Sequence, residues 1–305
     1  MASQWVVHIS DLHVGASMSG GGLVPKATGH DLFVLEAFSA KLAEIQTLYG
    51  GGPSLIISGD VSARGARDEL CLYRTIRDLG FKRDAHRQLP PLIEGFEHVL
   101  DLPGNHDYWN GVVLNPFVSL TTRARYFDSE PWHAEISVGS AFVTFHGICS
   151  TSDALPQEQA LAVGAFRKAD LDALERSIDA SRKRAGALRP YPIVVTHHSP
   201  SDGGPKARGI RTSALSDLDR LCSSKGVVGI LSGHAHSFSV VRKRPPEVRC
   251  GTTFQANWAL GRQKRMFILH EFRDTGHGLE WHVVPWYFDG AKDFIEVAAM
   301  SEQVL

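Results

Sequence analysis

The sequence of 305 residues predicts an α/β fold that mixes parallel and antiparallel strand pairing within a single domain. Short apolar runs typical of buried strands alternate with segments of helical periodicity, which is the pattern of βαβ units. Two other stretches contain apolar runs separated by Gly or Pro turns, which is typical of antiparallel strands. The candidate functional residues extend from position 11 to position 236, so a division into two independent domains would split them.

Five apolar runs predict the buried strands that organise the fold. Each run is short and is followed at once by polar residues. The runs lie at residues 5–10, 54–58, 99–100, 193–196 and 227–231. Open α/β sheets bind ligands at the carboxyl ends of their strands. We therefore expect the polar residues after the five runs to gather in one site.

Helical periodicity lies between these predicted strands. Apolar residues recur at intervals of three and four in segments 35–45 and 171–178. Another helix is expected to begin at Thr212 or Ser213, with three leucines on one face. The basic run 182–184 would lie at the C-terminal end of its helix, where cations interact favourably with the helix dipole.

Two stretches predict antiparallel pairing. Residues 132–151 are expected to form two strands joined near Gly139, and 237–284 form a C-terminal β-rich block with turns at 245–246 and 276–278. The segment from Gly15 to Gly29 has too few apolar residues for an element. Because it directly follows His13, it is a candidate active-site loop.

Composition narrows the functional classes. Lys and Arg total 32 and Asp and Glu total 33, so the overall charge does not favour nucleic-acid binding, and the basic runs 182–184 and 242–244 are interpreted as solvated structural segments. No apolar run approaches the roughly 20 residues that span a membrane, and the N-terminus does not resemble a targeting segment, so a cytoplasmic protein without a membrane partner is expected. The four cysteines form no Cys-x-x-Cys pair and are expected to be buried thiols.

The residues that follow the five predicted strands are candidate metal ligands. An Asp after a strand is often a turn residue, and a lone His is more often hydrogen-bonded than bound to metal. Together, however, the five strand ends offer enough oxygen and nitrogen donors for two ions that share a carboxylate. The candidates are Asp11, His13, Asp60, Asn105, His197, His234 and His236.

These residues stand in motifs that resemble those of the calcineurin-like metallophosphoesterase superfamily. In chain order the motifs are Asp-x-His, Gly-Asp, Gly-Asn-His-Asp, His and Gly-His-x-His, beginning at residues 11, 59, 104, 197 and 233. The resemblance covers about three quarters of the chain. It implies a four-layer α/β/β/α sandwich, in which two mixed β-sheets are flanked by helices.

The resemblance also implies a role for each residue. One metal would be held by Asp11, His13 and His236. The other would be held by Asn105, His197 and His234, with Asp60 as the bridge. His106 would be the catalytic acid, because it adjoins a ligand but is assigned to neither metal. His198 would support the site without binding metal.

The donor set does not select a single metal. Imidazole suits Zn and Fe, whereas carboxylate and amide oxygens suit Mn, so two divalent or trivalent ions of Mn, Fe or Zn are expected. Two cations about 3.5–4 Å apart can polarise a phosphoryl oxygen and generate hydroxide near neutral pH.

The sequence departs from the superfamily pattern at one position. Members often carry an acidic residue three positions after the bridging Asp, where it helps to orient the acid His, and this chain has Ala63 there. His106 could instead be oriented by Asp68, or its role as an acid could be reduced. Arg64 could pair with phosphate or form a structural salt bridge.

Other features point to a branch of the superfamily. The compact length, the Asp-Leu-His start and the segment 250–253 are most similar to the bacterial cyclic-nucleotide-phosphodiesterase-like branch. Tyr108 and Trp109 could stack on a base or pack within their loop. The prediction is a dinuclear phosphodiesterase acting on a small phosphoester such as a nucleotide. A phosphomonoesterase, a nuclease and an inactive metal-bound scaffold remain alternatives.

Overall fold

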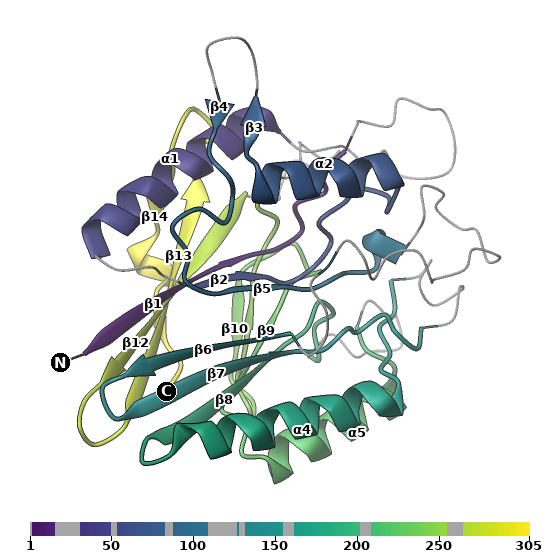
Figure 1. Cartoon of the computed structure of the whole chain (residues 1–305), viewed down its shortest axis with the longest axis vertical. Helices are drawn as coiled ribbons and strands as arrows, with labels where there is room; N and C mark the ends of the chain where they lie inside the picture. The colour runs from purple at the N-terminus through teal and green to yellow at the C-terminus, as the bar shows by residue number, and fades with distance from the viewer. Residues whose placement is uncertain are drawn as a thin grey trace.

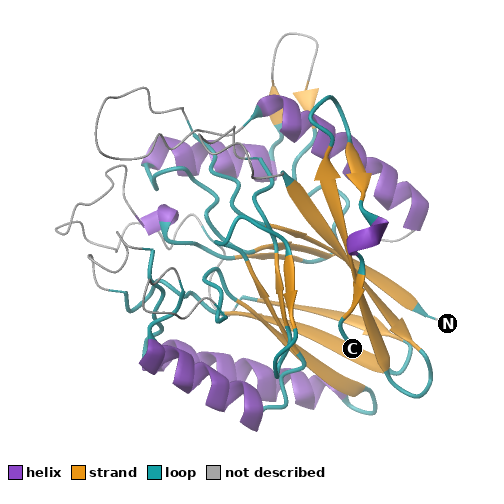
Figure 2. Ribbon diagram, turned by 180° about the vertical axis from the view of Figure 1, so that it is seen from behind, coloured by secondary structure: helices purple, strands orange, loops and turns teal. Residues whose placement is uncertain are grey.

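The fold is a sandwich of four layers, in which two packed sheets are flanked on each outer side by helices, two on each side among the described residues (Figure 1). The computed structural model describes residues 2–15, 31–49, 54–82, 88–108, 127, 132–154, 162–201, 209–254 and 265–305. Seen from behind, the helices again cover the outer faces of the sheets (Figure 2). The predicted α/β/β/α arrangement is confirmed.

The first sheet joins the N-terminal strands to the C-terminal ones. Its order is β14-β13-β12-β1-β2-β5, and β15 pairs with β13. β1, β2 and β5 are parallel, whereas β12 pairs antiparallel with β1. The bounds are β1 Ser3–Ile9, β2 Ser54–Ile57, β5 Val99–Asp101, β12 Met266–Asp274, β13 Leu279–Phe288, β14 Phe294–Glu296 and β15 Glu302–Gln303.

The second sheet has the order β10-β11-β9-β8-β7-β6. Its central strands are parallel, and β10 and β6 are antiparallel strands at its two edges. The bounds are β6 His133–Val138, β7 Ala141–Gly147, β8 Arg189–Val195, β9 Gly229–Ser232, β10 Ser239–Val241 and β11 Glu247–Arg249. The predicted C-terminal β-rich block is therefore divided, because β10 and β11 lie in this sheet while β12 and β13 lie in the first.

Helices cover the outer face of each sheet (Figure 1). α1 (Leu32–Tyr49) and α2 (Arg67–Asp78) lie over the first sheet, and α4 (Lys168–Ala185) and α5 (Thr212–Ser224) lie over the second. The chain also forms the short pair β3 (Phe81–Lys82) and β4 (Gln88–Leu89), and the 3-10 turns η1 (His106–Tyr108) and η4 (Ala298–Met300). α2 was not among the helices predicted from the sequence.

Alternation along the strands explains the layers. Val6 and Ile56 point into the core between the two sheets, whereas their neighbours Val7, Leu55 and Ile57 pack beneath α1 and α2. In the same way, β8 alternates between the core between the sheets and a third core under α4 and α5. Strands buried on both faces give continuous apolar runs. Burying one large apolar side chain stabilises the fold by about 1.5–3 kcal/mol.

The structure also bears on the compositional expectations. No helix in the described part of the chain is long and apolar enough to cross a membrane. Three of the cysteines are buried thiols as expected, but Cys71 is exposed because it lies on the solvent side of α2. In the basic runs, Arg184 pairs with Glu135 and Arg242 with Glu302, which agrees with their structural interpretation.

Candidate metal centre

The strand ends that carry the candidate ligands meet at one side of the molecule (Figure 1). β1, β2 and β5 of the first sheet deliver Asp11, His13, Asp60 and Asn105, and β8 and β9 of the second deliver the histidines after residue 196. All seven predicted ligands are at most intermediate in exposure, and five are buried. The structure thus brings together residues separated by more than 220 positions in the chain.

The candidate residues share an unusual backbone conformation. The φ angles of five of them are positive, between 48° and 66°. Such left-handed conformations cost residues other than Gly of order 1–3 kcal/mol, so they persist only where the surrounding structure enforces them. Their concentration at one site favours a functional explanation. The five are Asp11, His13, Asp60, His234 and His236.

Glycines within the motifs allow the close approach of these loops. Gly59 has a φ of +103°, and a Cβ there would lie 2.6 Å from Nδ1 of His197. A Cβ on Gly104 would lie 2.2 Å from Oδ1 of Asp60. Any larger residue at either position would therefore displace a candidate ligand. This explains the Gly-Asp and Gly-Asn pairs in physical terms.

One group of donors consists of Asp11, His13 and His236. Their ligand atoms all lie within 4.8 Å of one another. Nε2 of His236 is 2.9 Å from Oδ1 of Asp11. The other carboxylate oxygen of Asp11 accepts the backbone N–H of His234 at 3.0 Å. Oδ1 is therefore the oxygen that faces the two imidazoles.

A second group consists of Asp60, His197 and His234, which also lie within 4.8 Å of one another. Nε2 of His197 is 3.2 Å from Oδ2 of Asp60, 3.2 Å from Oδ1 of Asn105 and 3.3 Å from Nδ1 of His234. Two atoms that bond one ion at about 2.1 Å lie roughly 3–3.4 Å apart. The spacing of the second group therefore fits ligands around an ion, whereas in the first group Nε2 of His13 is 3.9 Å from Oδ1 of Asp11, a little wider than this range.

Unpaired nitrogens provide a further test of the fit. Among the described residues, neither ring nitrogen of His13 has a hydrogen-bond partner, nor does Nε2 of His234, although all three atoms are buried. Buried polar atoms are nearly always paired, so such atoms call for an explanation. Neutral imidazole nitrogens are common metal ligands, and a bound cation would satisfy them. The residues present fit a metal centre.

The electrostatics of the cluster suit a cation. Burial lowers the pKa of His197, but the charges of Asp60 and Asp11 and the bond to Asp60 outweigh it and raise that pKa to about 9. Burial would raise the pKa of Asp60, but the charges of His197, His106 and His13 hold it well below its usual value. The carboxylates of Asp60 and Asp11 are therefore ionised, and their negative charge keeps His197 protonated. A metal ion can replace that proton.

The tautomer of His197 follows from its surroundings. Its Nδ1 lies 2.8 Å from the carbonyl oxygen of Ser58, which can only accept a hydrogen bond. Nδ1 therefore carries a hydrogen, and Nε2 is the nitrogen directed at Asp60 and Asn105. A backbone carbonyl that fixes the far nitrogen in this way is a common partner of metal-binding histidines.

The main chain orients His106. Its Nδ1 donates to the carbonyl oxygen of Ala63 at 2.8 Å, and its backbone N–H donates to Oδ1 of Asp60 at 2.8 Å. Nε2 then faces the site, 3.8 Å from Oδ2 of Asp60. The suggestion that Asp68 orients this ring is wrong, because Asp68 is exposed on α2. Ala63, which stands where an acidic residue was expected, orients His106 through its backbone carbonyl instead.

Asp107 belongs to the Gly-Asn-His-Asp motif, but the sequence pattern did not indicate its role. Its carboxylate accepts hydrogen bonds from the backbone of Val61, Ser62 and Gly104 and from the hydroxyl of Ser62, at 2.7–3.2 Å. Burial and the charge of Asp60 raise its pKa to about 6 in spite of these bonds. Asp107 therefore ties the loop after β2 to the loop after β5. Its position in the Gly-Asn-His-Asp motif was the available signal.

The remaining candidates contact protein groups. Nε of Arg64 lies 2.7 Å from Oε1 of Glu69, so this arginine forms the structural salt bridge. Nδ1 of His198 and Oγ of Ser150 form a hydrogen bond at 2.8 Å. The hydroxyl of Tyr108 lies 3.3 Å from Sγ of Cys149. Trp109 and residues 16–29 of the candidate loop lie outside the described residues.

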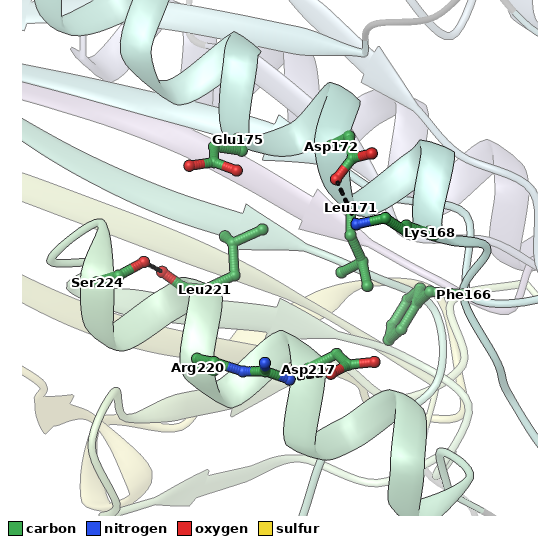
Figure 3. A pocket seen from close by; sticks show the side chains of 9 residues that line it. All are labelled: Phe166, Lys168, Leu171, Asp172, Glu175, Asp217, Arg220, Leu221 and Ser224. Carbon is green, nitrogen blue, oxygen red and sulfur yellow. Dashed lines mark hydrogen bonds and ion pairs between the residues drawn. The ribbon is translucent and has the colours of Figure 1, made fainter.

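A groove of about 310 Å³ between α4 and α5 is separate from these candidates (Figure 3). Its charged side chains are partners of one another or of nearby residues. Lys168 lies 3.7 Å from Asp172, Arg220 pairs with Asp217, and Glu175 lies 2.8 Å from Lys225. We interpret the groove as part of the helix packing.

Comparisons with known proteins bear on the family and the fold of the chain. Residues 5–238 match the family model of calcineurin-like phosphoesterases. Among solved structures, a dimetal phosphatase from Danio rerio has 9% identity and a TM-score of 0.59, with 100% of this chain and 99% of that chain covered. GAP50, the anchor in the inner membrane complex of Plasmodium, has 12% identity and a TM-score of 0.57, with 99% and 89% covered. No curated protein matches the sequence.

Proposed function

Because this chain belongs to the calcineurin-like phosphoesterase family, we propose that it is a dinuclear metal-dependent enzyme that hydrolyses a phosphodiester, with a small nucleotide as the substrate class. The observation that carries this proposal is the arrangement of two donor groups around Asp60. Its carboxylate belongs to the group with His197 and His234, and it also lies within 4.8 Å of His13 and His106. A shared carboxylate reduces the repulsion between two neighbouring cations.

The proposed ligands divide between two ions of Mn, Fe or Zn. Asp11, His13 and His236 hold one ion, and Asn105, His197 and His234 hold the other, with Asp60 as the bridge. When bound, such a pair supplies a nucleophilic hydroxide near neutral pH and charge stabilisation for the phosphoryl group. The protein keeps the donors buried and correctly oriented, through Ser58 behind His197 and the backbone N–H of His106 behind Asp60.

His106 is proposed to protonate the leaving group. Its Nδ1–H is engaged by Ala63, and Nε2 is the nitrogen that faces the site, 3.8 Å from Oδ2 of Asp60. The side chain is 19% exposed, which leaves it accessible at the edge of the buried cluster. His106 also lies within 4.8 Å of His13 and Asp60, so metal binding is the competing role for this ring. If His106 is an acid, removal of its ring should leave the metal content unchanged. If it is a ligand, removal of the ring should lower the metal content.

Within the described residues, the partner of Arg64 bears on the choice between a diester and a monoester. A phosphomonoester carries close to two negative charges at neutral pH, whereas a diester carries one. Arg64, the cation beside the Gly-Asp loop, is engaged by Glu69. It is therefore not a free partner for the additional charge of a monoester.

The proposal can be tested with two nitrophenyl substrates. The protein is stripped of metal with chelator, reloaded with Mn²⁺ and assayed on bis-nitrophenyl phosphate and on nitrophenyl phosphate. We expect metal-dependent turnover of both with preference for the diester, and no turnover by the Asp60→Ala variant. The Asp68→Ala variant, altered at an exposed position, serves as the control and should retain activity.

Other results would favour the alternatives. Preference for the monoester would indicate a phosphomonoesterase, and salt-sensitive binding of single-stranded DNA would indicate a nuclease. Protein that binds two metals but turns over neither substrate would support the inactive scaffold.

A further inference from the structure

The segment that follows β11 contacts the end of β1 beside the proposed metal centre. The hydroxyl of Thr252 donates to the backbone carbonyl of Asp11 at 2.7 Å. The backbone N–H of Thr253 donates to the carbonyl of Ser10 at 3.0 Å, and the N–H of Ser10 donates to the Thr253 hydroxyl at 3.3 Å. Both threonines are buried. The segment therefore fastens the chain where β1 turns into the site.

Hydrogen bonds from neighbouring segments stabilise the strained backbone conformation of Asp11. Its φ of +52° turns the chain out of the extended conformation of β1. Its N–H donates to Gly59 at 3.0 Å, and its Oδ2 accepts from the N–H of His234 at 3.0 Å. Its buried carbonyl accepts from a side chain, that of Thr252. A buried carbonyl left without a donor would be unfavourable, so the hydroxyl favours this one backbone orientation.

We propose that Thr252 is a positioning residue for one half of the metal centre. By holding the carbonyl of Asp11, it keeps Oδ1 of that residue directed at His13 and His236. This inference rests on the proposed function, because it assumes that these three residues bind metal. The Thr252 hydroxyl contacts the Asp11 group directly and reaches the other group only through the bond between Asp11 and the N–H of His234, so the effect is expected to be largest at the Asp11 group. Asp60, by contrast, accepts the N–H of His106 and has no hydrogen bond to Thr252 among those described.

Three variants isolate the hydroxyl. Thr252→Val removes the hydroxyl and keeps the shape of the side chain, whereas Thr252→Ser keeps the hydroxyl. Thr151→Val is the matched control, because Thr151 is equally buried and its hydroxyl has no hydrogen-bond partner among the described residues. Urea unfolding of each metal-free variant gives its change in global stability.

The measurement is a Zn²⁺ titration followed by NMR of the histidine ring nitrogens. Signals of His13 and His236 report one metal position, and those of His197 and His234 report the other. We expect Thr252→Val to need about 10-fold more Zn²⁺ at the first position with little change at the second, since loss of partners behind ligands typically costs 10–100-fold in affinity. Thr252→Ser should restore the affinity, and Thr151→Val should match the wild type.

Two results would overturn the inference. One is filling of the His13 and His236 position at the wild-type concentration of Zn²⁺ in Thr252→Val. The other is an equal loss at both positions, which would show general loosening of the fold. A wild-type protein that fills neither position would instead contradict the proposed metal centre itself, and this is seen without any variant.

Discussion

At the scale of single residues, hydrogen bonds to main-chain carbonyls fix the orientation of two histidine rings in the site. For His106, the carbonyl of Ala63 occupies Nδ1 and leaves Nε2 facing the cluster. For His197, the carbonyl of Ser58 plays the same part. A carbonyl is a pure acceptor, so in both rings the hydrogen on Nδ1 is fixed without a carboxylate partner. His106 is therefore oriented even though position 63 has no acidic side chain.

Replacement of His106 by Ala should reduce turnover according to the leaving group. A positioned acid typically contributes about 10²–10⁴-fold. Nitrophenolate departs without a proton but a ribose alkoxide requires one, so we expect a loss of that size on a nucleotide diester and a much smaller loss on bis-nitrophenyl phosphate. Kinetics on both substrates, with metal analysis of the variant, provide the measurement.

Equal losses on the two substrates would argue against an acid. If the Ala variant also contained less metal, His106 would be a ligand, consistent with its position within 4.8 Å of His13 and Asp60. If the metal content were unchanged, the ring would instead bind the phosphoryl group.

Among the elements, the loops after β2 and β5 are built around close contacts. Gly104 lies against the side chain of Asp60, and Asp107 in the same loop holds the backbone of Val61 and Ser62. The two loops therefore form one unit, and a change in either should alter the position of the Asp60 side chain.

Gly104→Ala should disturb the metal centre through shape alone. The added Cβ would lie 2.2 Å from Oδ1 of Asp60, so the carboxylate or the loop must move. We expect reduced metal content and a loss of diesterase activity of at least 10-fold, because small displacements in active sites are costly. Gly278→Ala is the control, since its Cβ would meet its nearest neighbour only at 4.0 Å. Wild-type metal content in Gly104→Ala would contradict this account.

The five strands that lead to the site could be predicted because both faces of each are buried and the apolar runs are continuous. The helix α2 was missed although its sequence carries a signal, because its buried positions Leu70, Tyr73 and Ile76 recur at intervals of three among charged residues, as in an amphipathic helix. The division of the C-terminal strands between two sheets was also missed. Strand periodicity carries no information about which sheet a strand joins.

The proposed ligands could be found from the sequence because each stands directly after a predicted strand. The contacts that hold these ligands in place could not be found from the sequence. The hydroxyl of Thr252 lies 241 residues from the Asp11 carbonyl that it contacts, and the orientation of His106 depends on a backbone carbonyl, which has no residue type to recognise. Such contacts appear only once the loops are placed in space.

For the molecule as a whole, buried histidines link stability to pH. His146 on β7 is buried, with its ring nitrogens 2.9 Å from the hydroxyls of Ser177 and Thr144. Burial lowers its pKa to about 3. In the unfolded chain a histidine has a pKa of about 6.5. As pH falls below about 6.5, the unfolded state therefore binds a proton that the folded state does not, and the free energy of unfolding decreases until the pH reaches about 3.

His146→Asn should weaken this pH dependence. Between pH 7.5 and pH 5, one such histidine lowers the free energy of unfolding by on the order of 2 kcal/mol. In the variant, the free energy of unfolding should therefore fall by that much less than in the wild type over the same pH range. Urea unfolding of the metal-free protein at both pH values measures it. The control, His277→Asn, removes an exposed histidine. An identical decrease in His146→Asn and the wild type would show that His146 does not contribute.

The two sheets share the proposed site. The first sheet supplies Asp11, His13, Asp60 and Asn105, and the second supplies His197, His234 and His236. Metal binding would therefore link the loops of both sheets. A ligand present at 100 times its dissociation constant stabilises the folded state by about 2.7 kcal/mol, so thermal stability should rise with metal concentration.

The most direct test of the central claim is a crystal structure of the protein grown with Mn²⁺, with anomalous diffraction used to locate the ions. We expect two anomalous peaks about 3.5–4 Å apart. A carboxylate oxygen of Asp60 should lie between them, with Asp11, His13 and His236 around one and Asn105, His197 and His234 around the other. A single peak, or two peaks that do not share Asp60, would contradict a dinuclear centre built on this bridge.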